Sequence, residues 1–274
     1  MCSYLLRAHA RCVACTQTMD ALAMRNSHPR DDCITFDEGP HIYTVNGDSG
    51  FTSVTTWLHS HFEKFDAEAV AKRIVERGTL PDSKYHGMTV KEITKTWKLN
   101  GQEASAAGTK LHENIERFYN GVEVPPEDRA LPDYQLFERF VDNFPVGAVP
   151  YRTEWMVWDD ALRLAGSIDM VFANDDGTLS IYDWKRCKDI KKHAFRGKSS
   201  TTQCIEHIPD SNFWHYSLQL NAYAWLLERH YGKVVRDLQL VVLHPRQHHP
   251  IVLKVPWLRQ ETNDLMTERA SMVA

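Results

Sequence analysis

The sequence lacks any run of 18 consecutive apolar residues, so we expect no membrane-spanning helix and no membrane partner. It also lacks a large excess of charge of one sign, because the formal net charge is −4 over 274 residues. Any attraction to nucleic acid must therefore be local. A secretory signal is not expected, because Met1–Arg11 has basic residues but neither an apolar core nor a small-residue cleavage site. A mitochondrial presequence stays open, since the first acidic residue is Asp20.

Cysteine is too sparse for a disulfide framework: six cysteines in 274 residues indicate a reducing compartment. Cys12-Val-Ala-Cys15 has no second pair at a zinc spacing, so we expect these residues, with Cys2 and Cys33, to be ordinary thiols. We therefore expect an intracellular protein. Nucleus, cytoplasm and mitochondrion stay open as locations, and so does a viral origin.

A hydrophobic content of 43% and eight tryptophans are enough for one large core. We predict an N-terminal extension over residues 1–33, helical or loosely ordered, and a single domain over residues 34–274. The fold class is α/β (α+β), with a central mixed sheet that has an antiparallel hairpin core and is flanked by helices. Helices are predicted over 66–77, 89–99, 101–120, 133–143, 212–228 and 257–272. Strands are predicted in a hairpin over 41–51 and over 149–158, 166–172, 179–185, 234–245 and 251–256.

A hairpin is predicted for Gly166–Lys185, where two apolar runs flank a polar loop. The loop Asn174–Thr178 reads Asn-Asp-Asp-Gly-Thr, which suits a type I turn closed by Gly177 in the left-handed conformation. This turn fixes the register of the two strands. It predicts that Asp169 faces Asp183.

Asp169 and Asp183 are thus expected on one face of a largely apolar sheet, where two facing carboxylates repel each other. The arrangement is favourable when a cation lies between them, and Lys185 lies two residues beyond Asp183 on the same face. The three residues predict a hard-metal site with a lysine beside its water. The alternative is a solvent-exposed hairpin end where Lys185 only neutralises the carboxylates. The apolar flanks disfavour it, because buried carboxylates need partners.

Gly166-x-x-Asp169 followed by Asp183-Trp184-Lys185 resembles the core of the PD-(D/E)xK nuclease superfamily, and most of all its RecB-like and phage-type exonuclease branch. The resemblance implies a restriction-endonuclease-like fold. It also implies one or two Mg²⁺ or Mn²⁺ ions held by Asp169, Asp183 and the backbone carbonyl of Trp184. Aspartate stands at position 183 where other members have glutamate, and the superfamily accepts both.

His112 and Glu116 lie four residues apart in a predicted helix and so share a face. Periodicity alone favours an ordinary surface pair. Gly108-x-x-x-His112, however, resembles the family's first helix, whose histidine reaches the metal. The resemblance implies that His112 is a metal ligand and that Glu116 acts behind the ligands or through water. Glu154, on the strand before Asp169, is a third acidic candidate, with a strand-end charge as an equal alternative.

Some relatives carry an iron–sulfur cluster on one early cysteine and three late ones. This sequence has only Cys187 and Cys204 after the predicted catalytic strands, so we expect no cluster. The expected cofactor is Mg²⁺ or Mn²⁺.

The strongest basic cluster begins at Lys185, with seven Lys or Arg against one Asp up to Lys198. A charged run is commonly a solvated loop. Its place directly after the metal strand favours phosphate binding instead. The predicted nucleic-acid-binding residues of this segment are Arg186, Lys188, Lys191, Lys192, Arg196 and Lys198.

Gln219-x-x-x-Tyr223, in a later helix, resembles the signature helix of the RecB-like branch. The resemblance implies that Gln219 orients the catalytic lysine or a phosphate and that Tyr223 lines the nucleic-acid path. Ser53 and Thr55 resemble a segment by which members hold the substrate, with helix capping as the alternative. Trp184 and neighbouring aromatic rings are expected to be available for base stacking.

The sequence therefore predicts a metal-dependent nuclease that hydrolyses phosphodiester bonds of DNA, with Asp169, Asp183, Lys185 and Gln219 as catalytic residues. An exonuclease acting on ends or single strands is favoured. Lys185 is expected to position or deprotonate the attacking water and to stabilise charge in the transition state. The alternatives are an inactive nucleic-acid-binding module of the same fold, an RNA-directed nuclease, and a structural protein whose carboxylates hold a stabilising ion.

Overall fold

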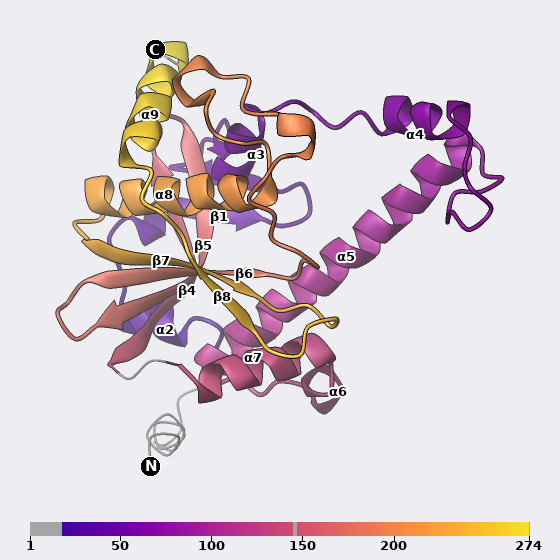
Figure 1. Ribbon diagram of the computed structural model, residues 1–274. Coiled ribbons are helices and arrows are strands. Elements are labelled where there is room, and N and C mark those ends of the chain that lie inside the picture. Colours follow the sequence, from indigo (N-terminus) through magenta and orange to yellow (C-terminus); the bar gives the residue numbers. More distant parts are fainter. Residues whose placement is uncertain (1–17, 145–146, 274) are drawn as a thin grey trace.

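The computed structural model describes residues 18–144 and 147–273 (Figure 1). The described part contains a mixed six-stranded sheet in the order β3-β5-β6-β7-β8, with β4 also paired to β5. Its strands are β3 (Thr52–Ser53), β4 (Ala148–Asp159), β5 (Leu164–Asn174), β6 (Leu179–Lys185), β7 (Val235–Val242) and β8 (Ile251–Lys254). The α-helices are α2 (Ala21–Arg25), α3 (Val54–His59), α4 (Ala67–Glu76), α5 (Val90–Tyr119), α6 (Pro126–Arg129), α7 (Pro132–Asp142), α8 (Asn212–His230) and α9 (Arg259–Val273).

Helices cover both faces of this sheet, α8 on one side and α5 with α7 on the other (Figure 1). Val171 and Ile181 point toward α3 and α8 and belong to the larger hydrophobic cluster. Phe172 and Trp184 point the other way, into a second cluster with α5 and α7. Successive strand residues alternate between faces, so a strand buried on both reads as a continuous apolar run. The predicted α/β fold, a central mixed sheet flanked by helices, is confirmed.

The hairpin between β5 and β6 has the predicted register, with Val171 opposite Ile181. The N–H of Asn174 donates to the carbonyl oxygen of Thr178 at 2.8 Å, which closes the loop. Gly177 has φ +78°, the left-handed conformation that the turn requires.

The strand directions make the sheet mixed, as predicted. The central β4-β5-β6 unit is antiparallel, but β3 runs parallel to β5 and β7 runs parallel to β6. Helix α8 lies between β6 and β7 in the chain and provides the crossover that a parallel pair needs.

The predicted helices over 89–99 and 101–120 form one helix, α5, of 30 residues. The prediction of a break near Gly101 was wrong. A glycine within a helix costs only about 1 kcal/mol, and no proline lies between Val90 and Tyr119. A capping box fixes the start, since the Thr89 and Glu92 side chains each bond the other residue's backbone N–H.

The early hairpin also differs from the prediction. Strand β2 (Ile42–Val45) pairs with the preceding β1 (Ile34–Asp37), not with the segment after Gly47. Asn46 and Gly47 both have positive φ and form the predicted tight turn, but only Val45 and Asp48 form a bridge across it. The chain then leaves to form β3, which joins the main sheet.

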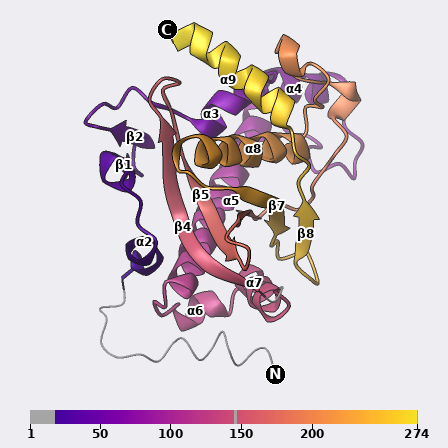
Figure 2. The same ribbon diagram turned by 90° about the vertical axis from the view of Figure 1, so that its left-hand side faces the viewer.

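The described residues 18–33 pack on the domain rather than extending away from it. Helix α2 and strand β1 lie along β4 (Figure 2). The Arg152 Nη1 atom lies 2.7 Å from Asp31 Oδ2, and Arg30 stacks 3.6 Å from the ring centroid of Trp158. Cys2, Cys12, Cys15 and the segment considered as a presequence lie outside the described residues. Among the described helices, none is long and apolar enough to cross a membrane.

Candidate functional site

The two carboxylates singled out in the hairpin lie where β5 and β6 separate. The pairing of the two strands ends at Met170 and Tyr182, one residue before Asp169 and Asp183. Beyond that point β6 continues beside β7 on its other edge. The Trp184 N–H donates to Asp169 Oδ2 at 2.9 Å, which ties the side chain of β5 to the backbone of β6. The fork therefore holds both carboxylates close to one edge of the separating strands.

Asp169 is one of three groups that converge from different elements. His112 of α5 places Nδ1 3.6 Å from Asp169 Oδ2 and 3.7 Å from Glu154 Oε1. One potential ligand atom of each residue lies within 4.8 Å of the others. We call His112, Glu154 and Asp169 the acidic cluster. This spacing is suited to a single small cation that takes oxygen and imidazole ligands.

Glu154 reaches the cluster through a local distortion of β4. Its φ is +41°, an uncommon value for a residue with a side chain, which costs about 1–3 kcal/mol. Thr153 and Trp155 on either side keep regular pairing with β5. Ser167 donates from Oγ to Glu154 Oε2 at 2.7 Å and so holds the carboxylate in place. The sequence did not single out Ser167, although it lies inside the Gly166-x-x-Asp169 pattern.

Asp183 is the most deeply buried of these carboxylates, with 2% of its surface exposed. Lys185 Nζ lies 2.7 Å from Asp183 Oδ2. This contact is an ion pair with poor hydrogen-bond angles, so among the described residues neither carboxylate oxygen of Asp183 accepts a well-formed hydrogen bond. A buried carboxylate left in this way is destabilising unless a further cation compensates it. The carboxylates of Asp169, Glu154 and Asp183, with the imidazole of His112, therefore fit a divalent cation.

The pKa values of Asp169 and His112, and of Glu116 beside the acidic cluster, also indicate a site for a cation. Burial and the nearby Asp183 raise the pKa of Asp169 to about 7. Burial and Glu154 raise the pKa of Glu116 to about 7. Burial alone would lower the pKa of His112, but Asp169 and Glu154 outweigh it and raise that pKa to about 9. Without a cation, protons therefore take the place of positive charge in this cluster.

His112 also forms a hydrogen bond with the backbone carbonyl of Trp184, which was itself predicted to be a metal ligand. Its Nε2 lies 3.0 Å from the backbone carbonyl oxygen of Trp184. Since a carbonyl only accepts, Nε2 carries the hydrogen and Nδ1 is the nitrogen that faces Asp169 and Glu154. The hydrogen bond to the Trp184 carbonyl thus fixes the orientation of the imidazole ring, with Nδ1 directed at the carboxylates.

Gln219 and Tyr223 lie beneath the fork rather than on its surface. Tyr223 was expected to line the nucleic-acid path, and in this structure its side chain is buried, with 3% of its surface exposed. A Cβ atom added at Gly166 would lie 2.8 Å from Tyr223 Cε1, so the glycine permits this close approach. The Gln219 amide donates to the Tyr223 hydroxyl at 3.5 Å, a weak bond. The ammonium of Lys185 lies instead 4.6 Å from the ring centroid of Tyr216, one turn earlier in α8.

The side chains of Trp184 and Ser53 are engaged in packing and helix capping. Trp184 is 1% exposed inside the second hydrophobic cluster, so its ring does not stack on bases. Ser53 caps α3: its Oγ accepts from the Thr56 N–H at 3.1 Å, and Thr55 Oγ1 lies 3.2 Å from it. The capping alternative therefore describes what the hydroxyl of Ser53 does here.

The basic segment after β6 is only partly available to a ligand. Arg186 pairs with Asp133 at 2.5 Å, and Lys198 pairs with Glu63 at 2.5 Å. Lys192 lies over the ring of Phe213, 4.7 Å from its centroid. The remaining predicted phosphate contacts, all exposed and without an ion pair among the described residues, are Lys188, Lys191 and Arg196.

Tyr43 is a further residue that the sequence did not reveal. It is 5% exposed, and burial together with the charges of Glu154 and Asp169 raises the pKa of its hydroxyl. It comes from β2, far from the motifs in sequence, so spacing carries no signal for it.

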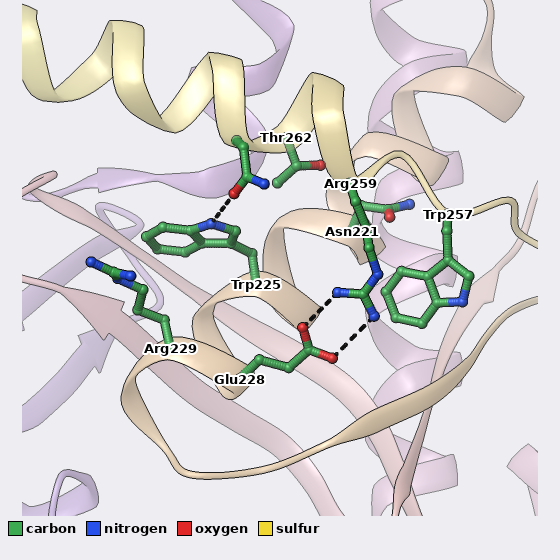
Figure 3. Close-up of a pocket in the computed structure, with 8 residues that line it drawn as sticks. Asn221, Trp225, Glu228, Arg229, Trp257, Arg259 and Thr262 are labelled. Carbon is green, nitrogen blue, oxygen red and sulfur yellow. Dashed lines mark hydrogen bonds and ion pairs between the residues drawn. The ribbon is translucent and has the colours of Figure 1, made fainter.

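A separate cavity of about 290 Å³ lies between α8 and α9 (Figure 3). Glu228 and Arg259 in its wall bond each other at 2.8 Å, and Arg259 stacks 4.1 Å from the ring centroid of Trp257. Glu228 and Arg259 thus satisfy each other within the wall, whereas among the described residues neither carboxylate oxygen of Asp183 accepts a well-formed hydrogen bond. We therefore place the candidate site at the acidic cluster.

Comparison with known proteins identifies the family of the chain. No curated protein matches the chain. Among solved structures, a candidate exonuclease from Eubacterium rectale is similar over 81% of this chain and 78% of its own, with 12% identity and a TM-score of 0.38. The crystal structure of SSO0001 is similar over 63% of this chain and 71% of its own, with 15% identity and a TM-score of 0.29. The sequence profile of the PD-(D/E)XK nuclease superfamily matches residues 58–271, a span that holds the whole acidic cluster, Asp183 and Lys185. The chain belongs to the PD-(D/E)XK nuclease superfamily.

Proposed function

We propose that this nuclease hydrolyses phosphodiester bonds of DNA with Mg²⁺ or Mn²⁺ and acts on ends or single strands as an exonuclease. The observation that carries the proposal is the buried Asp183 carboxylate, which lacks a well-formed hydrogen bond and lies beside Lys185 and Asp169. A purely structural ion site would not need an ammonium group at the same place.

The residues that would hold the cation are Asp169, Asp183 and Glu154, with His112 Nδ1 as a nitrogen ligand. A divalent ion held there would polarise a phosphate oxygen and make a bound water more acidic. His112 must lose a proton to bind, and Ser167 keeps Glu154 directed at the site.

Lys185 supplies a fixed positive charge. Burial alone would lower its pKa, but Asp183 and Asp169 outweigh burial and raise the pKa above that of an ordinary lysine. As an ammonium group, Lys185 donates hydrogen bonds to the attacking water or to a phosphate oxygen and stabilises the charge that develops during attack. A role as the base that removes a proton from water suits it less.

The test uses purified protein with end-labelled single-stranded, linear duplex and circular DNA, each with Mg²⁺, with Mn²⁺ and with EDTA. We expect cleavage with either ion, none with EDTA, and resistance of the circular substrate. Cleavage of circles would replace the exonuclease by an endonuclease, and cleavage of RNA alone would change the substrate class. No cleavage of any nucleic acid with either ion would refute the proposal.

Asp183→Asn should abolish turnover and leave DNA binding in place, because the amide keeps the shape of the carboxylate and removes its charge. Asp175→Asn is the matched control, since Asp175 is an exposed carboxylate of the same hairpin. A near-normal rate for Asp183→Asn would remove Asp183 from the catalytic site.

A further inference from the structure

Helix α5 leaves the body of the molecule and carries α4 at its far end (Figure 1). We propose that the N-terminal half of α5 is a docking surface for the substrate strand, on which Lys91, Lys95 and Lys98 contact phosphates several nucleotides away from the bond that is cleaved. The proposal rests on the proposed function and extends its substrate contacts well beyond the acidic cluster.

The first support is that these three lysines are free. All three are exposed, and within residues 18–144 and 147–273 none of them forms an ion pair. Other lysines of the same region are paired: Lys72 with Glu76 at 3.9 Å, and Lys110 with Asp128 at 2.8 Å. A set of unpaired cations on an acidic protein is a local source of attraction for phosphates.

The second support is the face on which the lysines lie. Positions spaced three and four apart share one face of a helix. The row that begins at Lys91 and continues at this spacing comprises Lys95, Lys98, Gln102, Ser105, Thr109, His112 and Glu116. The lysine row therefore runs along the face of α5 that ends at the acidic cluster.

The opposite face of α5 is already covered. Ile93 is fully buried there, and Ala71 of α4 is fully buried as well. Trp97 donates from Nε1 to the Tyr85 hydroxyl at 2.8 Å, and its ring lies 5.9 Å from that of Phe65. Packing of the arm thus fixes which side of the helix faces outward, and that side is the lysine row.

The third support is length. A helix rises 1.5 Å per residue, so Lys98 lies about 21 Å and Lys91 about 31 Å along the axis from His112. Successive phosphates of a strand in B-DNA are 3.4 Å apart along the axis, so these distances correspond to roughly six to nine nucleotides. Between them the row has only Gln102, Ser105 and Thr109, which are uncharged and exposed. A strand held at His112 can therefore run along α5 to the lysines.

The test compares the triple variant Lys91→Ala, Lys95→Ala, Lys98→Ala with the wild type on single strands of 4, 8, 12 and 16 nucleotides. Binding is measured by fluorescence anisotropy with Ca²⁺ over a range of salt. The control removes the same charge from α4 and the residue that follows it: Lys72→Ala, Arg73→Ala, Arg77→Ala.

We expect wild-type affinity to rise between 4 and 12 nucleotides and the triple variant to lose most of that rise, about tenfold at 0.15 M salt. Its salt slope on the 12-mer should flatten by about two, since each lost contact to a single strand contributes about 0.7. The 4-mer affinity and the control variant should match the wild type. Circular dichroism should show that the helical content of the triple variant equals that of the wild type.

The docking proposal is overturned if the triple variant keeps the length dependence and salt slope of the wild type, or if it weakens the 4-mer as much as the 12-mer. Failure of the proposed function has a different signature, because the wild type itself would then cleave no nucleic acid with Mg²⁺ or Mn²⁺. Wild-type cleavage of a 12-mer, with unchanged cleavage by the triple variant at saturating substrate, separates docking from chemistry.

Discussion

Asp169→Asn should stabilise the metal-free protein while abolishing its activity. In the absence of a cation, burial and Asp183 raise the pKa of Asp169 from 3.8 to about 7. Between these two pH values the folded protein holds a proton that the unfolded chain has released, so stability falls as the pH rises. The loss is complete above pH 7. Asparagine carries no charge, so the variant does not suffer this loss of stability. Its side-chain oxygen can still accept a hydrogen bond from the Trp184 N–H.

The size of the effect follows from the pKa. Raising an acid from 3.8 to about 7 destabilises the folded state by roughly 4 kcal/mol above pH 7. The pKa of about 7 already includes the attraction of Asp169 to His112 and Lys185. The neutral oxygen of asparagine accepts more weakly from the Trp184 N–H than a carboxylate does, which offsets part of the gain. We therefore expect a net stabilisation of roughly 2 kcal/mol at pH 8, or about 4–8 °C in Tm, and none at pH 4.

Urea and thermal unfolding in EDTA at pH 4, 6 and 8 measure this difference, with Asp175→Asn as an exposed control that should change little. Added Mn²⁺ should reverse the order of stability, because the wild type binds the ion more tightly than the variant and binding stabilises the folded state. If Asp169→Asn is no more stable than the wild type in EDTA at pH 8, Asp169 and Asp183 do not repel each other as the structure implies.

Three further substitutions test separate parts of the site. Gly166→Ala should cost about 1–3 kcal/mol in denaturant unfolding, because the new Cβ would lie 2.8 Å from the ring of Tyr223; unchanged stability would show that the ring moves freely. Ser167→Ala should lower kcat about tenfold with little change in KM or Tm, since it frees Glu154 to turn away; a parallel loss of Tm would indicate a structural role instead. Arg186→Ala should cost roughly 3 kcal/mol in stability and leave the salt dependence of DNA binding unchanged, because its guanidinium pairs with a buried carboxylate; a flatter salt dependence would return it to the phosphate-binding set.

The parts of the fold that could be predicted from the sequence are those fixed by neighbours in the chain. The loop Asn174–Thr178 sets its own turn type, and the turn sets the register of β5 and β6. The cap at Ser53 and the capping box at Thr89 likewise depend on residues three positions apart.

The rest depends on contacts that the sequence does not show. Whether a basic side chain is free or ion-paired depends on a carboxylate far away in the chain. Arg186 pairs with Asp133, and Lys198 pairs with Glu63. Tyr223 has the right spacing for a nucleic-acid contact but packs against Gly166, 57 positions earlier in the chain. These outcomes are three-dimensional, and periodicity carries no information about them.

The middle of α5 has a dynamic consequence. All nine residues from Lys98 to Ala106 are exposed, so this stretch bridges the arm and the body with only its own helical hydrogen bonds. Opening it uncovers no hydrophobic core, and Gly101 lies within it, so the free energy of local opening is far below that of global unfolding. Its amide hydrogens should therefore exchange with solvent well before those around Ile93 or Leu111 at either end. Local opening of this stretch would make it a hinge, on which the arm could change direction while His112 stays anchored to the sheet.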